Sequence, residues 1–222
     1  MKPKPIKILV LFYSFTGTTA QLARALAEGA ANVGGVEVVI KQVPELLPPD
    51  FFADKPKLKN IRDDLNREFP IATAKDMIEA DGIAFGTPTH FGSFASQLKQ
   101  FIDQLSGEWL VGKLLNKPAA VFCAAGSTHG GEEMTLLSMI IPLLNLGMIP
   151  VGIPYPIQGE GPNFDAGSPY GAIYVTGGGR KLSESDKKVA RILGTRLATM
   201  AQIMNCGCSS CNLCHDLNKK VT

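Results

Sequence analysis

The chain alternates short, continuous apolar runs with longer segments that carry apolar residues at helical spacing. The first apolar run, residues 8–12, passes through a hydroxyl-rich turn into residues 20–31, where alanine and leucine recur with a helical period. A continuous apolar run bounded by a turn predicts a buried strand, and the period that follows predicts a helix. The chain is therefore predicted to open with a strand, a loop and a helix.

The same alternation continues along the chain. Further strands are predicted at 36–40, 82–86, 118–125 and 148–153, further helices at 74–79, 95–105, 132–146 and 184–204, and long connections at 44–72, with a short helix near 61–67, and at 154–180. Strands that alternate with helices imply right-handed crossovers and a parallel sheet with helices on both faces. We expect a three-layer α/β fold in one domain, residues 1–204.

The turn after the first strand carries four hydroxyl side chains around Gly17, namely Ser14, Thr16, Thr18 and Thr19. It contains no lysine and does not match the G-x-x-x-x-G-K-[ST] loop of nucleoside triphosphate sites. Backbone N–H groups at the start of a helix, together with hydroxyl donors, can hold a phosphate monoester without a cation. Serine and threonine also cap helices, so capping alone is an alternative interpretation.

The stretch YSFTGTT at 13–19 resembles the phosphate loop of flavodoxin-like proteins, which hold the phosphate of flavin mononucleotide (FMN). Four further stretches are similar, in the same order, to the WrbA family of NAD(P)H:quinone oxidoreductases, at 43–45, 85–93, 126–132 and 167–172. The similarity covers residues 6–204. It implies a flavodoxin-like fold with a five-stranded parallel sheet in the order 2-1-3-4-5. It also implies two-electron reduction of quinones by NADH or NADPH in a ping-pong cycle.

In parallel sheets, ligands lie beyond the carboxyl ends of the strands, where the strand order reverses. The loops at 14–19, 87–93 and 124–131 should therefore converge, and the resemblance implies that they bind FMN. The expected FMN-binding residues are Ser14, Phe15, Thr16, Gly17, Thr18 and Thr19, then Pro88, Thr89, His90, Phe91 and Gly92, and finally Ala124, Ala125, Gly126, Ser127 and Thr128. No protein acid or base is expected, because the flavin carries the chemistry.

The resemblance implies that Trp109, Tyr170 and Asn145 lie on the substrate side. Packing in the core is an alternative interpretation for the two aromatic residues, and Tyr170 is expected to close over the site of its own or a neighbouring subunit. His90 stands where the family often has arginine, so a cation at this position would depend on pH. Asn145 and Leu146 stand where the family often has two histidines.

Residues 205–222 are expected to form a separate cysteine-rich tail. It contains Cys206, Cys208, Cys211 and Cys214, followed by His215. Soft ligands at such short spacing suit zinc or an iron–sulfur cluster, although four ligands in so short a run would be strained around one ion. The c-type haem attachment string also fits 211–215, and a flexible tail with free thiols is a further alternative.

Composition and the apolar pattern limit the kinds of partner and cellular location that the sequence favours. A formal net charge of +2 without a cluster of lysine and arginine does not favour a nucleic-acid surface. The first apolar run passes straight into a polar turn, unlike a signal peptide, and proline and glycine interrupt residues 139–153, which disfavours a membrane span. We expect a cytoplasmic protein with reduced cysteines.

The resemblance also implies a homotetramer built as a dimer of dimers. One alternative function is a flavodoxin-like electron-transfer protein, which binds FMN but receives electrons from a protein partner. Another is a redox or metal sensor in which the cysteine-rich tail is the working part. Nicotinamide use rests on the resemblance, since the sequence shows no adenosine-recognition motif.

Overall fold

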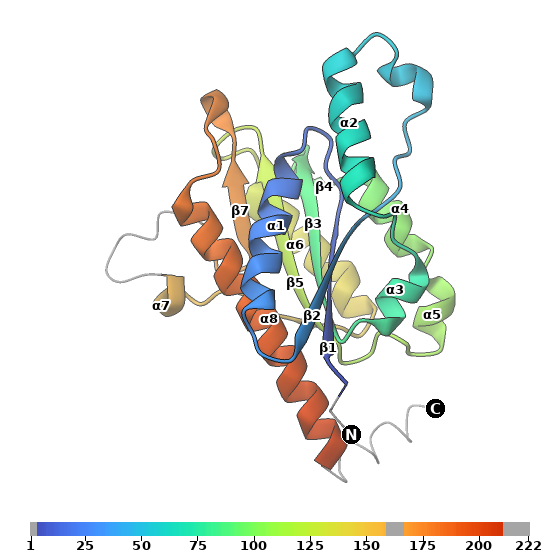
Figure 1. The fold of residues 1–222 in the computed structure, drawn as a ribbon, viewed down its shortest axis with the longest axis vertical. Coiled ribbons are helices and arrows are strands. Elements are labelled where there is room, and N and C mark those ends of the chain that lie inside the picture. Colours follow the sequence, from blue (N-terminus) through green and yellow to red (C-terminus); the bar gives the residue numbers. More distant parts are fainter. Residues whose placement is uncertain (1–3, 159–166, 211–222) are drawn as a thin grey trace.

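A parallel sheet forms the centre of the protein, and helices cover both of its faces (Figure 1). The computed structural model describes residues 4–158 and 167–210. In spatial order the main strands are β2 (Val36–Gln42), β1 (Ile6–Phe12), β3 (Gly82–His90), β5 (Pro118–Ala125) and β6 (Ile149–Pro150). Two short strands complete the sheet: β4 (Ser93–Phe94) pairs antiparallel with the end of β3, and β7 (Ala172–Val175) pairs parallel with β5.

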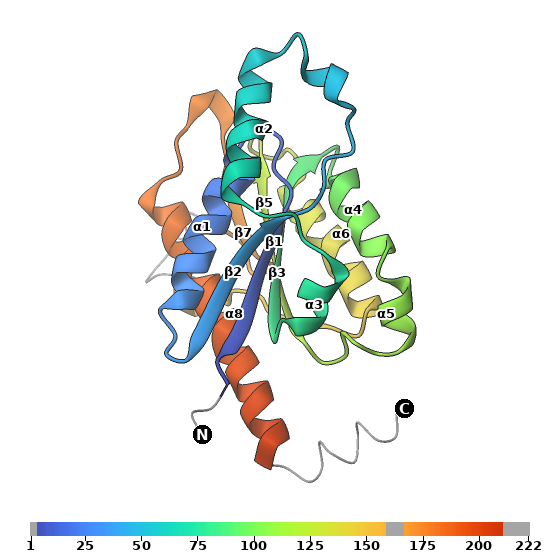
Figure 2. The ribbon, with the colours of Figure 1, turned by 45° about the vertical axis from the view of Figure 1, so that its right-hand side comes forward.

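The helices form the two outer layers (Figure 2). One face of the sheet is covered by α1 (Thr18–Ala31) and α8 (Glu184–Ser210), and the other by α3 (Ala74–Glu79), α4 (Ser96–Asp103) and α6 (Glu132–Asn145). The shorter elements are η1 (Pro49–Phe52), α5 (Ser106–Leu110), α7 (Tyr155–Gln158) and η2 (Gly177–Gly179). The helix α2 (Pro56–Glu68) stands beyond the carboxyl ends of the strands.

Alternation along β1 and the residue after it sorts the side chains onto the two faces of the sheet. Ile8, Val10 and Phe12 pack in the core under α1 and α8, whereas Leu9, Leu11 and Tyr13 pack in the core under α3, α4 and α6. A strand that is buried on both sides must be apolar at every position. This requirement explains why the first apolar run of the sequence is continuous rather than alternating.

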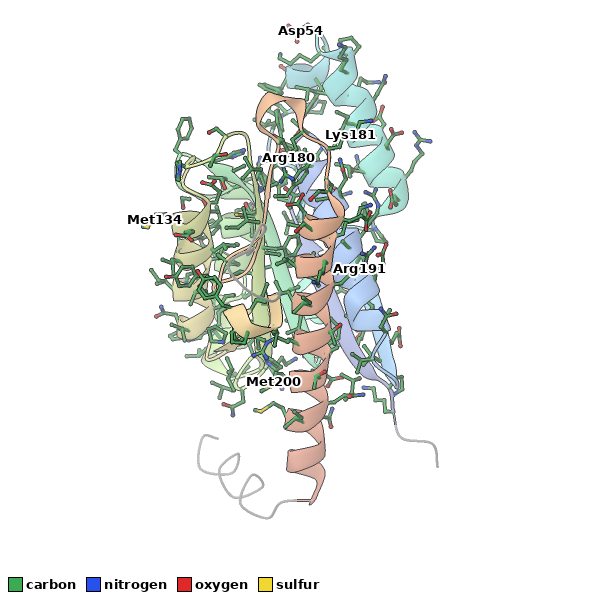
Figure 3. The ribbon with its side chains drawn as sticks, turned by 90° about the vertical axis from the view of Figure 1, so that its left-hand side faces the viewer. Asp54, Met134, Arg180, Lys181, Arg191 and Met200 are labelled. Carbon is green, nitrogen blue, oxygen red and sulfur yellow. The ribbon has the colours of Figure 1, made fainter. Side chains whose placement is uncertain are left out.

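Two glycines let α1 and α8 pack closely. A Cβ atom at Gly194 would lie 2.0 Å from the carbonyl oxygen of Leu26, and one at Gly29 would lie 2.0 Å from that of Arg191. Arg191 Nε also donates to Glu28 at 2.9 Å across the same pair of helices (Figure 3). The second half of α1, the helix that follows the hydroxyl-rich turn, is therefore fixed against the longest helix described.

The prediction of a three-layer α/β fold with the strand order 2-1-3-4-5 is confirmed, but among the described residues the sheet has seven strands rather than five, and the fifth predicted strand is shorter than expected. The apolar run at 148–153 forms only β6, which pairs with the first two residues of β5. The last four residues of β5 pair instead with β7, which lies inside the loop predicted at 154–180. The sequence around this edge strand is rich in glycine and proline, and its pairing partner lies about 50 residues away in the sequence. No local pattern therefore predicted the strand.

Several predicted boundaries also differ. The strand β3 continues through His90 and forms a hairpin with β4 where a loop was predicted. The helix predicted at 95–105 is α4, and the short α5 that follows it was not predicted. The short helix expected near 61–67 is the longer α2. The last helix runs through Ser210, past the predicted domain boundary at 204. Among the described helices, none combines the length and the apolar character that a membrane crossing requires.

We expect Gly194→Ala to lower the free energy of unfolding by about 1–3 kcal/mol, because the added methyl group has no room against α1. Helix propensity alone predicts the opposite change in the free energy of unfolding, because it favours alanine over glycine by about 1 kcal/mol. Urea unfolding measures the difference. Gly107→Ala in α5 is the matched control, since a Cβ there meets nothing within 4 Å. Equal losses in both variants would contradict the close-packing argument.

Candidate functional site

Three loops meet at the carboxyl edge of the sheet, because β1, β3 and β5 are neighbours. The first two are linked by a backbone bond of 2.9 Å from the Tyr13 N–H to the Gly86 oxygen. The second and third touch, since a Cβ atom at Gly131 would lie 2.8 Å from Gly92 Cα. The convergence expected from the sequence is therefore present in the structure.

The first loop has the properties of an anion site. Gly17 precedes α1 with φ of 81°, and no side chain caps this helix. Within the described residues, the backbone N–H groups of 15–20 have no acceptor. The hydroxyls of Ser14 and Thr19 are buried and also lack a partner in the part of the chain that the structure describes. Buried donors in native proteins are nearly always satisfied, so this arrangement points to an acceptor that comes from outside the chain.

The second loop is the hairpin between β3 and β4. The Thr87 hydroxyl fixes its base by accepting a bond of 2.9 Å from the Ala95 N–H. At its tip Phe91 and Gly92 have φ of 51° and 74°, and the Phe91 ring is fully exposed. Desolvation holds the pKa of His90 below its ordinary value, so the imidazole is mostly neutral at pH 7. The position that often carries arginine in the resembled family therefore holds no cation near neutral pH.

The third loop turns tightly before α6. The Gly130 N–H donates to the Ser127 oxygen at 3.2 Å, and the His129 N–H donates to Glu132 Oε1 at 3.1 Å. The Thr176 N–H, beyond β7, donates to the Ala125 oxygen at 2.9 Å. The third loop is therefore supported by the residue that follows β7, the edge strand that the sequence did not predict.

Cys123 lies at the end of β5 and is fully buried. Burial raises the pKa of its thiol to about 12. A thiol in this state is not a nucleophile at neutral pH. Cys123 therefore packs as a small core residue.

The three residues expected on the substrate side do not lie with these loops in one subunit. Trp109 Nε1 donates to the Asn145 carbonyl oxygen at 2.8 Å, so these two lie together. They lie near the amino end of β5, about 23 Å along this strand from the loops. Tyr170 is 38% exposed in a turn beside the middle of β5, where a Cβ at Gly171 would lie 2.0 Å from the Val121 oxygen.

A buried polar cluster behind the first loop was missed at the sequence level. It joins Arg62 of α2 to Glu45 and, through Glu45, to Tyr13 and Gln97. An arginine in a strongly polar helix is normally solvated, and nothing in the local pattern marks this one as buried. Only the contact between α2 and the first loop creates the cluster.

The cysteine-rich tail lies largely outside the described residues. Cys211, Cys214 and His215 are beyond them, and for Cys206 and Cys208 only the helical course of the backbone is described. Among the described residues, no group of three or more histidine, cysteine, aspartate or glutamate side chains is placed to hold a metal ion.

The fold defines the class: a flavodoxin-like protein with a doubly wound sheet, whose three candidate ligand-binding loops lie at the carboxyl edge of that sheet. The family model described as NADPH-dependent FMN reductase matches residues 6–162. The chain belongs to this family.

Curated relatives agree with the resemblance to quinone oxidoreductases. A protein from Geotalea uraniireducens named NAD(P)H dehydrogenase (quinone) is 40% identical over 200 residues, which are 88% of this chain and 98% of that protein. A protein of the same name from Geotalea daltonii is also 40% identical over 200 residues, 88% of this chain and 97% of the relative. The membership inferred from the five sequence stretches is therefore confirmed.

Solved structures support the fold. A flavodoxin described as a WrbA-like protein from Agrobacterium tumefaciens superposes with a TM-score of 0.60 at 23% identity, covering 89% of this chain and 98% of that one. A flavodoxin from the domain Archaea superposes with a TM-score of 0.56 at 18% identity, covering 89% of this chain and 99% of that one. At these identities the likeness concerns the fold alone.

We expect Thr19→Val to separate stability from ligand binding. The Thr19 hydroxyl is buried without a partner, so the free protein should keep its stability or gain up to about 1 kcal/mol. FMN binding should weaken about tenfold through the loss of one hydrogen bond. Urea unfolding and quenching of flavin fluorescence measure the two effects. Thr199→Val on the exposed part of α8 is the control, and a Thr19 variant that lost stability but bound FMN normally would identify Thr19 as a structural cap.

Proposed function

We propose that this chain is an FMN-dependent oxidoreductase that reduces quinones by two electrons with NADH or NADPH. The observation that carries the proposal is the first loop, with its six backbone N–H groups and two buried hydroxyls that lack acceptors. The terminal phosphate of FMN supplies acceptors of the right number and charge. Family membership and the names of the curated relatives support the same conclusion.

The three loops would divide the work of holding the cofactor. Ser14, Thr19 and the N–H groups at the start of α1 would bind the phosphate, and the loops after β3 and β5 would flank the ribityl chain and the ring. When bound, FMN supplies the hydride chemistry. The chain contributes position and neutral donors, including the His90 imidazole, which is mostly uncharged at pH 7.

We further propose that the working unit is a homotetramer. The outer faces of α5 and α6 expose six large apolar side chains, which are Trp109, Leu110, Val111, Met134, Ile141 and Leu144. An apolar surface of this kind is typical of association between copies. Assembly would also explain Trp109 and Asn145, which can reach a flavin site only if it belongs to a neighbouring subunit.

Two expectations from the sequence stay predictions. One is a cytoplasmic location. The other is a zinc or iron–sulfur site in the tail, which metal analysis of anaerobically purified protein tests.

Rapid mixing of the FMN-loaded protein tests the proposed reaction. Without oxygen, NADH or NADPH should bleach the visible absorbance of the flavin, and benzoquinone should then restore it. Steady-state rates at several quinone concentrations should give the parallel double-reciprocal lines of a ping-pong cycle. A flavin that stays oxidised with both nicotinamides would instead favour the electron-transfer protein.

Ile141→Glu tests the assembly. In the proposed tetramer a carboxylate at position 141 of α6 would be buried between subunits. It should dissociate the tetramer, because an unpaired charge is costly in an apolar interface. Sedimentation velocity measures the change in mass, and FMN binding should persist, since Ile141 is remote from the three loops. Leu46→Glu, at an exposed apolar side chain outside this face, is the control. A wild-type protein that sedimented as a monomer at all concentrations would contradict the proposal.

A further inference from the structure

Arg62 is a buried charged side chain at the base of the phosphate loop. Its Nη2 lies 3.1 Å from the Ser14 carbonyl oxygen and 2.5 Å from Glu45 Oε2. The two charged side chains are only 8% and 14% exposed. The helix α2 thus reaches back to the residue at which the loop begins.

The carboxylate that holds Arg62 is itself fixed. Burial alone would raise the pKa of Glu45, but bonds from Gln97, the Leu47 N–H and Tyr13, with the charge of Arg62, hold that pKa below its ordinary value. Tyr13 donates to Glu45 Oε2 at 2.8 Å, and burial followed by this bond raises the tyrosine pKa above its ordinary value. The cluster therefore keeps one protonation state around neutral pH, with Glu45 ionised and Tyr13 protonated.

Hydrogen bonds and ion pairs, more than apolar packing, hold α2 in place. Only Arg62 and Leu65 of this helix are buried. Gln42 donates to the Leu65 carbonyl oxygen at 3.2 Å, and the exposed side chains of Arg24 and Glu68 pair at the C-terminal end of the helix. The segment projects beyond the sheet, with Asp54 at its tip (Figure 3).

The bond from Arg62 sets the direction of a peptide group in the loop. A planar trans peptide directs its carbonyl and the following N–H to opposite sides. Holding the Ser14 oxygen toward Arg62 therefore turns the Phe15 N–H, one of the six donors without an acceptor, the other way. Ile61 of α2 also lies beside the turn, since a Cβ at Gly17 would lie 3.6 Å from its Cγ2 atom.

We propose that Arg62, held by Glu45, is a positioning residue for the phosphate subsite: it fixes the Ser14–Phe15 peptide so that the loop is preorganised before FMN binds. Buried ion pairs add little stability over apolar side chains of the same volume, and Arg62 Nε is buried with no partner in residues 4–158 and 167–210. An apolar residue would anchor α2 equally well. Only a branched donor also orients the carbonyl group, which explains an arginine here. The inference rests on the proposed binding of FMN phosphate at this loop.

Comparing FMN with riboflavin, which lacks the phosphate, tests the inference. For Arg62→Met we expect FMN affinity to fall about tenfold to a hundredfold while riboflavin affinity stays unchanged. Arg24→Met is the matched control, because it removes the other arginine tie to α2 without touching the loop, and both affinities should remain at wild-type values. Fluorescence titration of the apoprotein measures all four constants.

Unchanged riboflavin binding also shows that a variant is folded. Should Arg62→Met fail to fold, Arg62→Lys keeps the charge without the branched donor, and its loss should again be confined to FMN. If Arg62→Met weakened the binding of FMN and riboflavin by the same factor, or weakened neither, the positioning role would be overturned while the proposed function stayed intact. A wild-type protein that bound FMN and riboflavin equally would instead remove the phosphate assignment on which the inference rests.

Discussion

The left-handed turn at Gly17 is the constraint on which the site depends. It lies between β1, whose last five residues are buried, and a helix without a side-chain cap, so consecutive backbone donors and two buried hydroxyls have no acceptor among the described residues. Such a turn would relax if its flanks could move. They are held on one side by β1 in the middle of the sheet and on the other by α1, whose glycine contacts fix it against α8.

This arrangement trades stability for binding. Every buried donor without a partner costs free energy in the unliganded protein, and a ligand that supplies acceptors recovers it. The polar cluster under the loop follows the same logic, since a guanidinium and a carboxylate are desolvated where apolar side chains would serve packing equally well. Unpaired polar groups in an otherwise well-packed core are expected at functional sites.

The structure also separates two ends of the sheet. The carboxyl end gathers the three loops and has the properties of a cofactor site. Near the amino end of β5 lie Trp109 and Asn145, next to exposed apolar side chains of α5 and α6. A single chain cannot bring these ends together, because rigid strands about 23 Å long stand between them. Functions that need both ends would require contact between copies.

The sequence alone determined the features that depend on local patterns. Continuous apolar runs and helical periods predicted the α/β class and β5 to the residue at both ends, and the family resemblance implied the strand order. The hydroxyls and glycine of the first turn predicted an anion site there, because strand, turn and helix follow one another directly, and this site stays a proposal. Family stretches along the chain identified the class of enzyme relatives.

The tertiary structure decided what depends on distant partners. The edge strand β7 exists only because β5 offers it a pairing edge, and β3 extends past its apolar run only because β4 folds back on it. The burial of Arg62 depends on where α2 packs, so a residue that the local sequence assigns to solvent becomes part of the site. Hydrogen bonds and desolvation between segments far apart in the chain have no local signature, which is why only the folded structure revealed them.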